Sequence, residues 1–318
     1  LGFLPMVSSA LLFPINSRYL EPEDYGLVTQ ANVIQNILIL FVLFGINGVL
    51  FRYSIDYSKN KRDQRFFQGH LFVQTLLQFG LLALVMFLAG DVFFKLIWGD
   101  TFSFDKYGWY VIISCGVMGL NRILIQSSRA YEQLSAVLVL SVLPLTGTII
   151  GALIGIVYLE LGALGNIAGK AIGMALVSGL IYIVYAFRVR LTLNKKLLLS
   201  LWRHGAFLLA YGLLGILSKD LDKLLVGNLF DQAKLGVFNV ATVLAMPVGV
   251  LLVSVWQAAS PNMYRKLNIL ARQNEHDSEQ IAAAKRHIRF HYDGMLLFSA
   301  LLVLGVIGVA EPALWVLA

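Results

Sequence analysis

Nine apolar segments, each about as long as a membrane is thick, dominate this sequence. A helix needs about 20 apolar residues to cross the hydrocarbon layer of a bilayer. The candidate spans are residues 2–20, 27–53, 67–90, 108–128, 136–158, 165–187, 205–229, 237–259 and 292–310. Apolar residues make up 58% of the chain and charged residues only 14%, with a mean hydropathy of +0.75. The sequence therefore predicts an all-α, polytopic membrane helix bundle.

The start of the chain and its cysteine content give two further expectations. The chain begins at Leu1 with no basic segment ahead of the first apolar run. We therefore expect no secretory signal peptide and a sequence that begins inside a longer protein. Cys115 is the single cysteine, which excludes an internal disulfide.

Basic residues are distributed unevenly over the connections between the candidate spans. Successive connections lie on alternating sides of the membrane. The connections on one side hold sixteen of the 25 Lys and Arg residues, namely Lys59, Lys61, Arg62, Arg65, Arg129, Arg188, Arg190, Lys195, Lys196, Arg203, Arg265, Lys266, Arg272, Lys285, Arg286 and Arg289. The connections on the other side hold three, Lys95, Lys106 and Lys234. The positive-inside rule places the rich set, and with it the N-terminus, in the cytoplasm. The net charge of +7 is then explained by membrane topology and does not indicate nucleic-acid binding.

One short stretch of the sequence occurs twice. Residues 20–33 and 230–243 align at an offset of 210. The identical pairs are Gly26/Gly236, Ala31/Ala241 and Val33/Val243. Internal repeats are typical of transporters. We expect two lobes related by a parallel six-helix repeat, with residues 1–190 as the N-terminal lobe and residues 191–318 as a partial C-terminal lobe of three helices.

Charged residues occur inside the candidate spans, where they are costly. They are Arg18, Arg52, Arg122, Lys170, Lys219 and Lys223, accompanied by Asp220 and Asp222. An ionised side chain at the bilayer centre costs about 2.5–3.5 kcal/mol on insertion scales, so it usually faces a wet cavity or a partner. Six cations against two anions favour an anionic ligand. The alternatives are snorkelling to lipid phosphates, strongest for Lys170, Arg18 and Arg52, and local pairing of Lys219 and Lys223 with the two aspartates.

The seventh candidate span carries a polar face. His204, Tyr211, Ser218 and Asp222 are spaced by 7, 7 and 4 residues, which places them on one side of a helix. We interpret this stripe as the lining of a cavity, with hydrogen bonding between helices as the alternative. Residues 195–202, KKLLLSLW, form either a short amphipathic helix on the inner surface or an inward extension of the same span.

These observations define a set of candidate binding residues and argue against catalysis. The candidate substrate-binding residues are Arg18, Arg52, Arg122, Lys219, Asp222, Lys223, His204, Tyr211 and Ser218. The five histidines have no metal-ligand spacing, and no glycine-rich phosphate loop with a lysine is present. We therefore expect a protein that is not an enzyme and that has no cofactor and no metal.

Several segments resemble one known family in chain order. The run LLFPINSRYLEPEDYGLVTQA (11–31) resembles the first-hairpin signature of the polysaccharide transport family, within the multidrug/oligosaccharidyl-lipid/polysaccharide exporter superfamily. DLDKLLVGNLFDQAKLGVFNVA (220–241) is similar to the family's seventh helix and following turn, with Asp222 as the recurring acid. Softer similarities occur at 45–54, 127–133 and 161–173. The family normally has twelve to fourteen helices and commonly a proline at the start of the seventh, where this chain reads His204-Gly205-Ala206-Phe207.

The resemblance implies a function. The family contains flippases that move a polyprenyl-diphosphate-linked oligosaccharide, such as an O-antigen unit, across the bacterial cytoplasmic (inner) membrane by alternating access. It implies that Arg18, Arg52 and Arg122 hold the diphosphate while the lipid tail stays in the bilayer. The implied partners are the lipid-linked anionic oligosaccharide, membrane lipids, and the polysaccharide polymerase and glycosyltransferases of the same pathway.

Three other hypotheses about the function are compatible with the sequence. A multidrug/cation antiporter of the same superfamily would need acidic residues deep in the first six spans, where none lies. A lipid II flippase would share the two lobes and the cationic cavity, and the first-hairpin signature argues against it. A membrane-embedded glycosyltransferase or polymerase would need a sizeable extracytoplasmic loop, and the loops here are short.

Overall fold

The computed structural model describes residues 14–58 and 60–243, together with Leu12 and six isolated residues between 289 and 300. The chain divides into two compact units, residues 1–240 and 241–318, and nearly all described residues belong to the first. Most of the first, eighth and ninth candidate spans lies outside the described residues.

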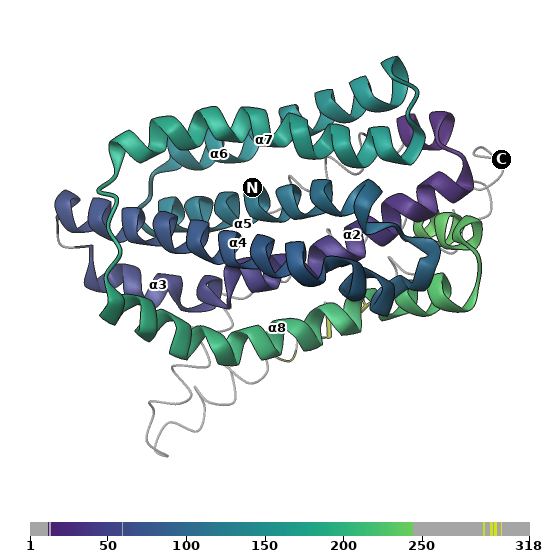
Figure 1. Cartoon of the computed structure of the whole chain (residues 1–318). Coiled ribbons are helices and arrows are strands. Elements are labelled where there is room, and N and C mark those ends of the chain that lie inside the picture. The colour runs from purple at the N-terminus through teal and green to yellow at the C-terminus, as the bar shows by residue number, and fades with distance from the viewer. Residues whose placement is uncertain are drawn as a thin grey trace. The chain divides into compact units, whose positions relative to one another are not determined.

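All regular structure in these described ranges is helical (Figure 1). The long helices are α2 (Pro22–Leu43), α3 (Ile46–Asp56), α4 (Lys61–Trp98), α5 (Trp109–Ala130), α6 (Leu134–Leu153), α7 (Gly162–Arg188) and α8 (Lys195–Leu229). Six helical segments are long and apolar enough to cross a membrane, and they coincide with the second to seventh predicted spans. The prediction of a polytopic helix bundle is confirmed for this part of the chain, and the two-lobed repeat stays a prediction.

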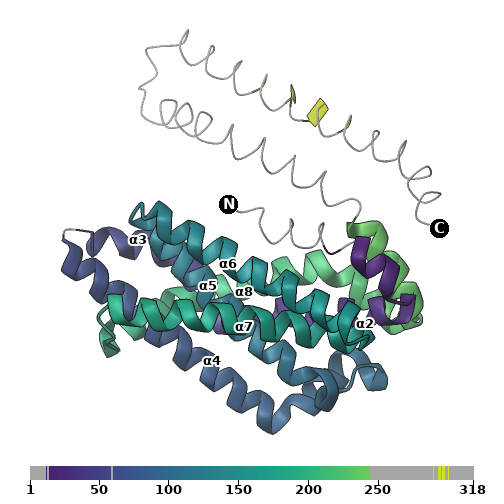
Figure 2. The same cartoon turned by 90° about the horizontal axis from the view of Figure 1, so that it is seen from above.

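Short turns join the helices, so successive spans run in opposite directions and the first unit has two distinct ends. At one end α3, α5 and α7 finish and α4, α6 and α8 begin, on the left of Figures 1 and 2. We call this the basic end. The lysines and arginines that lie there are Arg52, Lys61, Arg62, Arg65, Arg129, Arg188, Arg190, Lys195, Lys196 and Arg203.

The second span is broken near its middle. Phe44 and Gly45 have positive φ angles of 44° and 68°, so α2 ends and α3 begins there within one apolar segment. A side chain at Gly45 would collide with the backbone oxygen of Gly205 in α8, and one at Gly205 would collide with the oxygen of Phe44. The break therefore lies where two backbones cross without intervening side chains.

The seventh span is one continuous helix that reaches to the basic end. Helix α8 begins at Lys195, and the Asn194 side chain caps it by accepting hydrogen bonds from the backbone N–H groups of Lys196 (2.9 Å) and Leu197 (3.2 Å). Leu197 and Leu201 are buried in the apolar cluster at this end. The segment 195–202 is thus an inward extension of the span and not a separate surface helix.

Helices α6 and α7 are joined by three pairs of glycines. On one side lie Gly147 and Gly151 of α6 and Gly155 of the short π-helix that continues it (Ile154–Tyr158). They face Gly173, Gly169 and Gly165 of α7, in that order, and a Cβ atom on any of the six would collide with the backbone oxygen of its partner. Small residues spaced by four let membrane helices approach closely. This contact occupies the half of the hairpin that is farther from the basic end.

Aromatic rings close the bundle at the end opposite the basic end. Phe94 lies with its ring centroid 5.1 Å from that of Phe104, and Phe102 lies 5.1 Å from Tyr107. Trp98 is 1% exposed in the same cluster. A well-packed aromatic cluster leaves little room for water at this end.

The two copies of the repeated stretch contact each other. A side chain at Gly26 would collide with the backbone oxygen of Gln232, and a side chain at Gly236 would collide with that of Pro22. Since Gln232 and Pro22 are themselves equivalent at the offset of 210, the contact is reciprocal. The lobe boundary predicted at residue 190 divides the chain by its sequence repeat. The compact unit is defined by contacts instead, and it extends to Val240 because α8 packs against α2 and α3.

Candidate functional site

A cavity of about 470 Å³ lies among α2, α3, α5, α6 and α7. Its volume is within the range of about 300–1,000 Å³ that is usual for ligand sites. The lining side chains are Gln35, Asn47, Phe51, Met118, Asn121, Arg122, Ile125, Gln126, Arg129, Leu140, Ser141, Pro144, Leu145, Thr148, Lys170 and Met174. The wall is therefore a mixture of apolar groups, amides, hydroxyls and cations.

Three cations and no carboxylates line this cavity in the described part of the chain. Arg122 and Arg129 come from α5, and Lys170 comes from α7. None of the four ion pairs between described residues includes any of these three side chains. Uncompensated charge is expensive at membrane depth unless water or an anion is present, so the cavity is suited to a negatively charged ligand.

The three cations are spread along the axis of the bundle. The amide of Asn121 in α5 donates a hydrogen bond of 3.3 Å to the hydroxyl of Ser178 in α7, which places these two residues at one level. Lys170 precedes Ser178 by eight residues, and Arg129 follows Asn121 by eight. At a rise of about 1.5 Å per residue, each lies about 12 Å from that level on opposite sides. The cations thus cover about 24 Å of a hydrocarbon layer that is about 30 Å thick.

Neutral polar groups in the cavity wall also lack partners. The Oδ1 atoms of Asn47 and Asn121 and the hydroxyl of Ser141 are buried and have no hydrogen-bond partner among the described residues. The Gln126 amide meanwhile donates to the backbone oxygen of Asn47 at 2.6 Å. Buried polar groups are normally paired, so these atoms are positioned to bind water or a ligand rich in hydroxyl groups.

A second, much smaller cavity continues from the first toward the end opposite the basic end. It has a volume of about 20 Å³ and shares Gln35 and Lys170 with the larger cavity. The amide of Gln35 contacts the sulfur of Met118, and the thiol of Cys115 lies 3.6 Å from the backbone oxygen of Gln35. Gln35 and Lys170 therefore lie at the boundary of both cavities, whereas Arg129 brings the large cavity to the basic end.

Of the nine sequence-predicted site residues, Arg122 lines this cavity and the other eight do not. Arg18, in the helical turn 14–19, and Arg52, in α3, are both exposed. Phe51, the neighbour of Arg52, does line the cavity, so successive residues of α3 point in different directions. The structure therefore does not bring Arg18 and Arg52 together with Arg122 in the described cavity.

The polar stripe of the seventh span lies on an exposed side of α8. His204, Tyr211, Ser218 and Asp222 are all exposed, Tyr211 by 76%, and Lys219 is exposed as well. His204 is held near the basic end, where its Nδ1 lies 3.0 Å from the Tyr53 hydroxyl. The prediction that these residues share one helical side is compatible with their exposure, and their role in binding stays a prediction.

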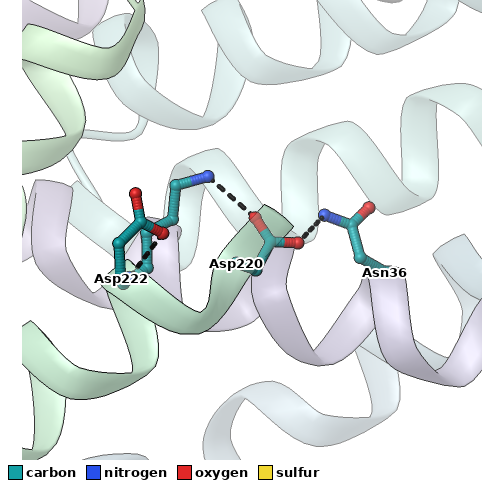
Figure 3. Close-up of polar contacts among 4 residues, drawn as sticks. Asn36, Asp220 and Asp222 are labelled. Carbon is teal, nitrogen blue, oxygen red and sulfur yellow. Dashed lines mark hydrogen bonds and ion pairs between the residues drawn. The ribbon is translucent and has the colours of Figure 1, made fainter. Parts of the chain in front are cut away.

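A buried ionic network joins α8 to α2 (Figure 3). Asp220 is 0% exposed, accepts a hydrogen bond of 2.9 Å from the Lys223 ammonium, and accepts one of 3.0 Å from the Asn36 amide. Asp222 only accepts from the backbone N–H of Lys223 at 2.8 Å. The local pairing considered for Lys223 is therefore present, with Asp220 and not Asp222 as its partner.

Sequence reasoning missed two of the three cavity cations. We counted Arg129 with the basic connections and favoured snorkelling for Lys170, which instead lines both cavities. The spacing of residues in the sequence could have indicated both helix faces. Asn166, Lys170 and Met174 follow each other at four-residue spacing, and so do Met118, Arg122 and Gln126, which places each set on one side of its helix.

Comparisons with known proteins give one family match and one membrane-protein relative. Residues 15–268 match a family described as "Polysaccharide biosynthesis protein". An "Uncharacterized membrane protein" of Haemophilus influenzae is 21% identical over 268 residues, which are 81% of this chain and 61% of that protein. The chain thus spans less than two thirds of the length of this relative. No solved structure matches the chain.

Proposed function

The chain belongs to the polysaccharide biosynthesis protein family, and we propose that it acts in a flippase that moves a polyprenyl-diphosphate-linked oligosaccharide across the cytoplasmic membrane. On this proposal it transports and does not catalyse. The observation that carries the proposal is the cavity whose charged lining consists of Arg122, Arg129 and Lys170. Guanidinium and ammonium groups in an otherwise apolar bundle are the groups that bind a diphosphate.

The rest of the cavity wall suits the sugar part of such a substrate. The free oxygens of Asn47 and Asn121 accept hydrogen bonds, and the Ser141 hydroxyl both donates and accepts them. The cavity reaches the basic end at Arg129, and only a space of about 20 Å³ adjoins Gln35 on the opposite side. With the basic end in the cytoplasm, as the positive-inside rule predicts, the head group enters from the side on which lipid-linked units are assembled.

Movement across the membrane requires more than one half of a transporter. The reciprocal contact of Gly26 and Gly236 supports a parallel repeat, with α8 as the first long helix of a second lobe. The polysaccharide polymerase and glycosyltransferases that follow and precede the flippase in the pathway are the proposed partners.

The multidrug/cation antiporter is the weaker alternative. An antiporter for cations needs carboxylates that exchange the drug for Na⁺ or H⁺, and none lines the described cavity. The buried carboxylate of Asp220 is paired with Lys223, which leaves no net negative charge there. A lipid II flippase shares the cationic cavity, and only substrate identification separates it from the main proposal.

The proposal is tested by neutralising the cavity cations in the full-length protein. In a strain without the chromosomal gene, Arg122→Gln and Lys170→Gln are expected to lower surface glycan at least tenfold and to raise the pool of lipid-linked units inside the cell. Arg203→Gln is the matched control, because Arg203 is an exposed cation at the basic end that lines neither cavity. Immunoblotting checks protein levels.

Two outcomes would reject the proposal. Full glycan export by both cavity variants at normal protein level would remove the role of the cations. Equal loss in Arg203→Gln would show that net charge, and not the cavity, controls export.

Arg52→Gln adds a separate comparison. We expect a smaller loss than with Arg122→Gln, because Arg52 does not line the described cavity.

A further inference from the structure

Helices α6 and α7 separate toward the basic end. Their glycine pairs end at Gly147 and Gly173, and beyond this point the facing side chains are large. A groove of about 380 Å³ lies between them there. Its apolar lining residues are Ala136, Val139, Leu140, Leu180, Ile181 and Val184. The two helices of the hairpin are therefore in close contact in the half with the glycine pairs, and a groove lies between them in the half nearer the basic end.

The groove leads into a cationic pocket at the basic end. This pocket has a volume of about 570 Å³ and is lined by Arg65 of α4, Arg188 of α7, and the amide side chains of Gln68 and Gln133. The two spaces share four residues, namely Ser135, Ala136, Tyr185 and Arg188. They thus form one continuous surface with an apolar part and a cationic part.

No carboxylate opposes the two arginines among the described residues that line this surface. The backbone oxygen of Arg65 accepts a hydrogen bond of 3.2 Å from the N–H of Arg190, which fixes the start of α4 beside the end of α7. The Gln68 amide donates to Gln133 at 3.1 Å and ties the pocket to the turn before α6. Arg65 and Arg188 are therefore held on one pocket by the fold.

The geometry points to an anionic phospholipid of the adjacent leaflet as the occupant, with an acyl chain in the groove and its phosphate between Arg65 and Arg188. The lining of α7 from Leu180 to Arg188 covers about 12 Å, most of one leaflet's share of a hydrocarbon layer of about 30 Å. A gap between helices at this depth fills with hydrocarbon, and basic pockets between transmembrane helices bind anionic head groups.

A soluble anion or a zwitterionic lipid fits the same surface less well. Free phosphate would use the cationic pocket and leave the groove empty. A choline head group would place a cation beside two arginines. The anionic phospholipid is the one occupant that matches both the apolar and the cationic part, and it requires no transport activity, so this inference stands apart from the proposed function.

Lipid retention by the purified full-length protein tests the head-group contact. Native mass spectrometry counts the lipids that stay bound after incubation with phosphatidylglycerol or phosphatidylcholine in micelles. Wild type is expected to retain phosphatidylglycerol. The double variant Arg65→Gln/Arg188→Gln is expected to retain at most about one tenth as much of this lipid. Arg62→Gln/Arg203→Gln is the matched control, because neither residue lines the surface.

A second pair of variants tests the acyl chain. Ala136 lies at the junction of groove and pocket, whereas Leu138 on the same helix is 51% exposed and lines neither. Ala136→Trp is expected to displace the lipid and Leu138→Trp to leave it bound. Circular dichroism and gel filtration check folding. If the double arginine variant does not fold, the two tryptophan variants and the two lipids in wild type decide the question.

Four results of these retention measurements would overturn the inference. They are equal retention of phosphatidylcholine and phosphatidylglycerol, unchanged retention in the double arginine variant, equal effects of the two tryptophan substitutions, and retention only of a polyprenyl-diphosphate lipid. Displacement of phosphatidylglycerol by an equal concentration of pyrophosphate would also reject it, because the acyl chain would then contribute nothing.

Discussion

Adding one methyl group to Gly151 is expected to separate α6 from α7. A Cβ atom at this position would lie closer to the backbone oxygen of Gly169 than the 3.0 Å below which real Cβ atoms essentially never come. Backbone atoms cannot rotate away as a side chain can. The two helices must therefore move apart by roughly 1 Å, which also weakens the contacts at the two neighbouring glycine pairs.

The size of this effect follows from packing. Overfilling a close contact costs about 1–3 kcal/mol, and a gap of 0.5–1 Å removes about a quarter to a half of the dispersion energy of the atoms that face it. Replacing glycine by alanine inside a helix returns up to about 1 kcal/mol through helix propensity. We expect Gly151→Ala to lower the free energy of unfolding by up to about 2 kcal/mol once both terms are counted.

Gly179 provides the matched control on α7. No atom lies within 4 Å of the position that its Cβ would occupy, so Gly179→Ala adds the same methyl group without a collision. Both variants gain helix propensity equally. The difference between them therefore isolates the collision and is expected to be about 1–3 kcal/mol.

Unfolding of the purified chain by dodecyl sulfate in mixed micelles, followed by circular dichroism, measures this difference. Gly179→Ala should unfold at the same or a higher fraction of dodecyl sulfate than wild type, and Gly151→Ala at a lower one. Equal stability of the two variants would refute the close packing of the glycine pairs, and with it the reason why the hairpin is open only at the basic end.

The remaining predictions concern the buried network and the start of α8. Asp220→Ala leaves the Lys223 ammonium without its buried partner and should cost about 3–5 kcal/mol in the same unfolding assay, whereas Asp222→Ala, at an exposed neighbour, should change stability by less than about 1 kcal/mol. A smaller loss for Asp220→Ala than for Asp222→Ala would contradict the pairing in Figure 3. Asn194→Ala removes the acceptor that caps α8 and should cost about 0.5–2 kcal/mol, while Asn194→Asp should retain the stability of wild type; equal losses would contradict the cap.

The apolar segments predicted the spans well, because a run of about 20 apolar residues rarely forms anything other than a membrane-spanning helix. The break at Phe44 and Gly45 was not predicted, since apolar length alone does not report a local left-handed turn. The glycines of 147–155 and 165–173 were also overlooked, although their four-residue spacing is visible in the sequence. Nothing in composition shows that this spacing pairs two particular helices.

The candidate site was harder to predict than the fold. Depth in a span singled out Arg122, which lines the cavity, and its role in binding stays a prediction. Depth does not tell which way a side chain points. Snorkelling was favoured for Lys170 because it lies near a span end. The rotation of α7 set by its glycines instead turns it toward the cavity. In the same way Asp220, and not Asp222, is turned toward α2, a difference of two residues that periodicity alone leaves open.

The reciprocal contact of Gly26 and Gly236 has an evolutionary consequence. Each glycine touches the backbone of the other copy, so a side chain gained at one position cannot be accommodated by any change of side chain at the other. Natural selection is therefore expected to act jointly on these two positions, which lie 210 residues apart. Among related sequences we expect glycine at both positions or at neither, and frequent loss of one glycine alone would show that the crossing point tolerates a spacer.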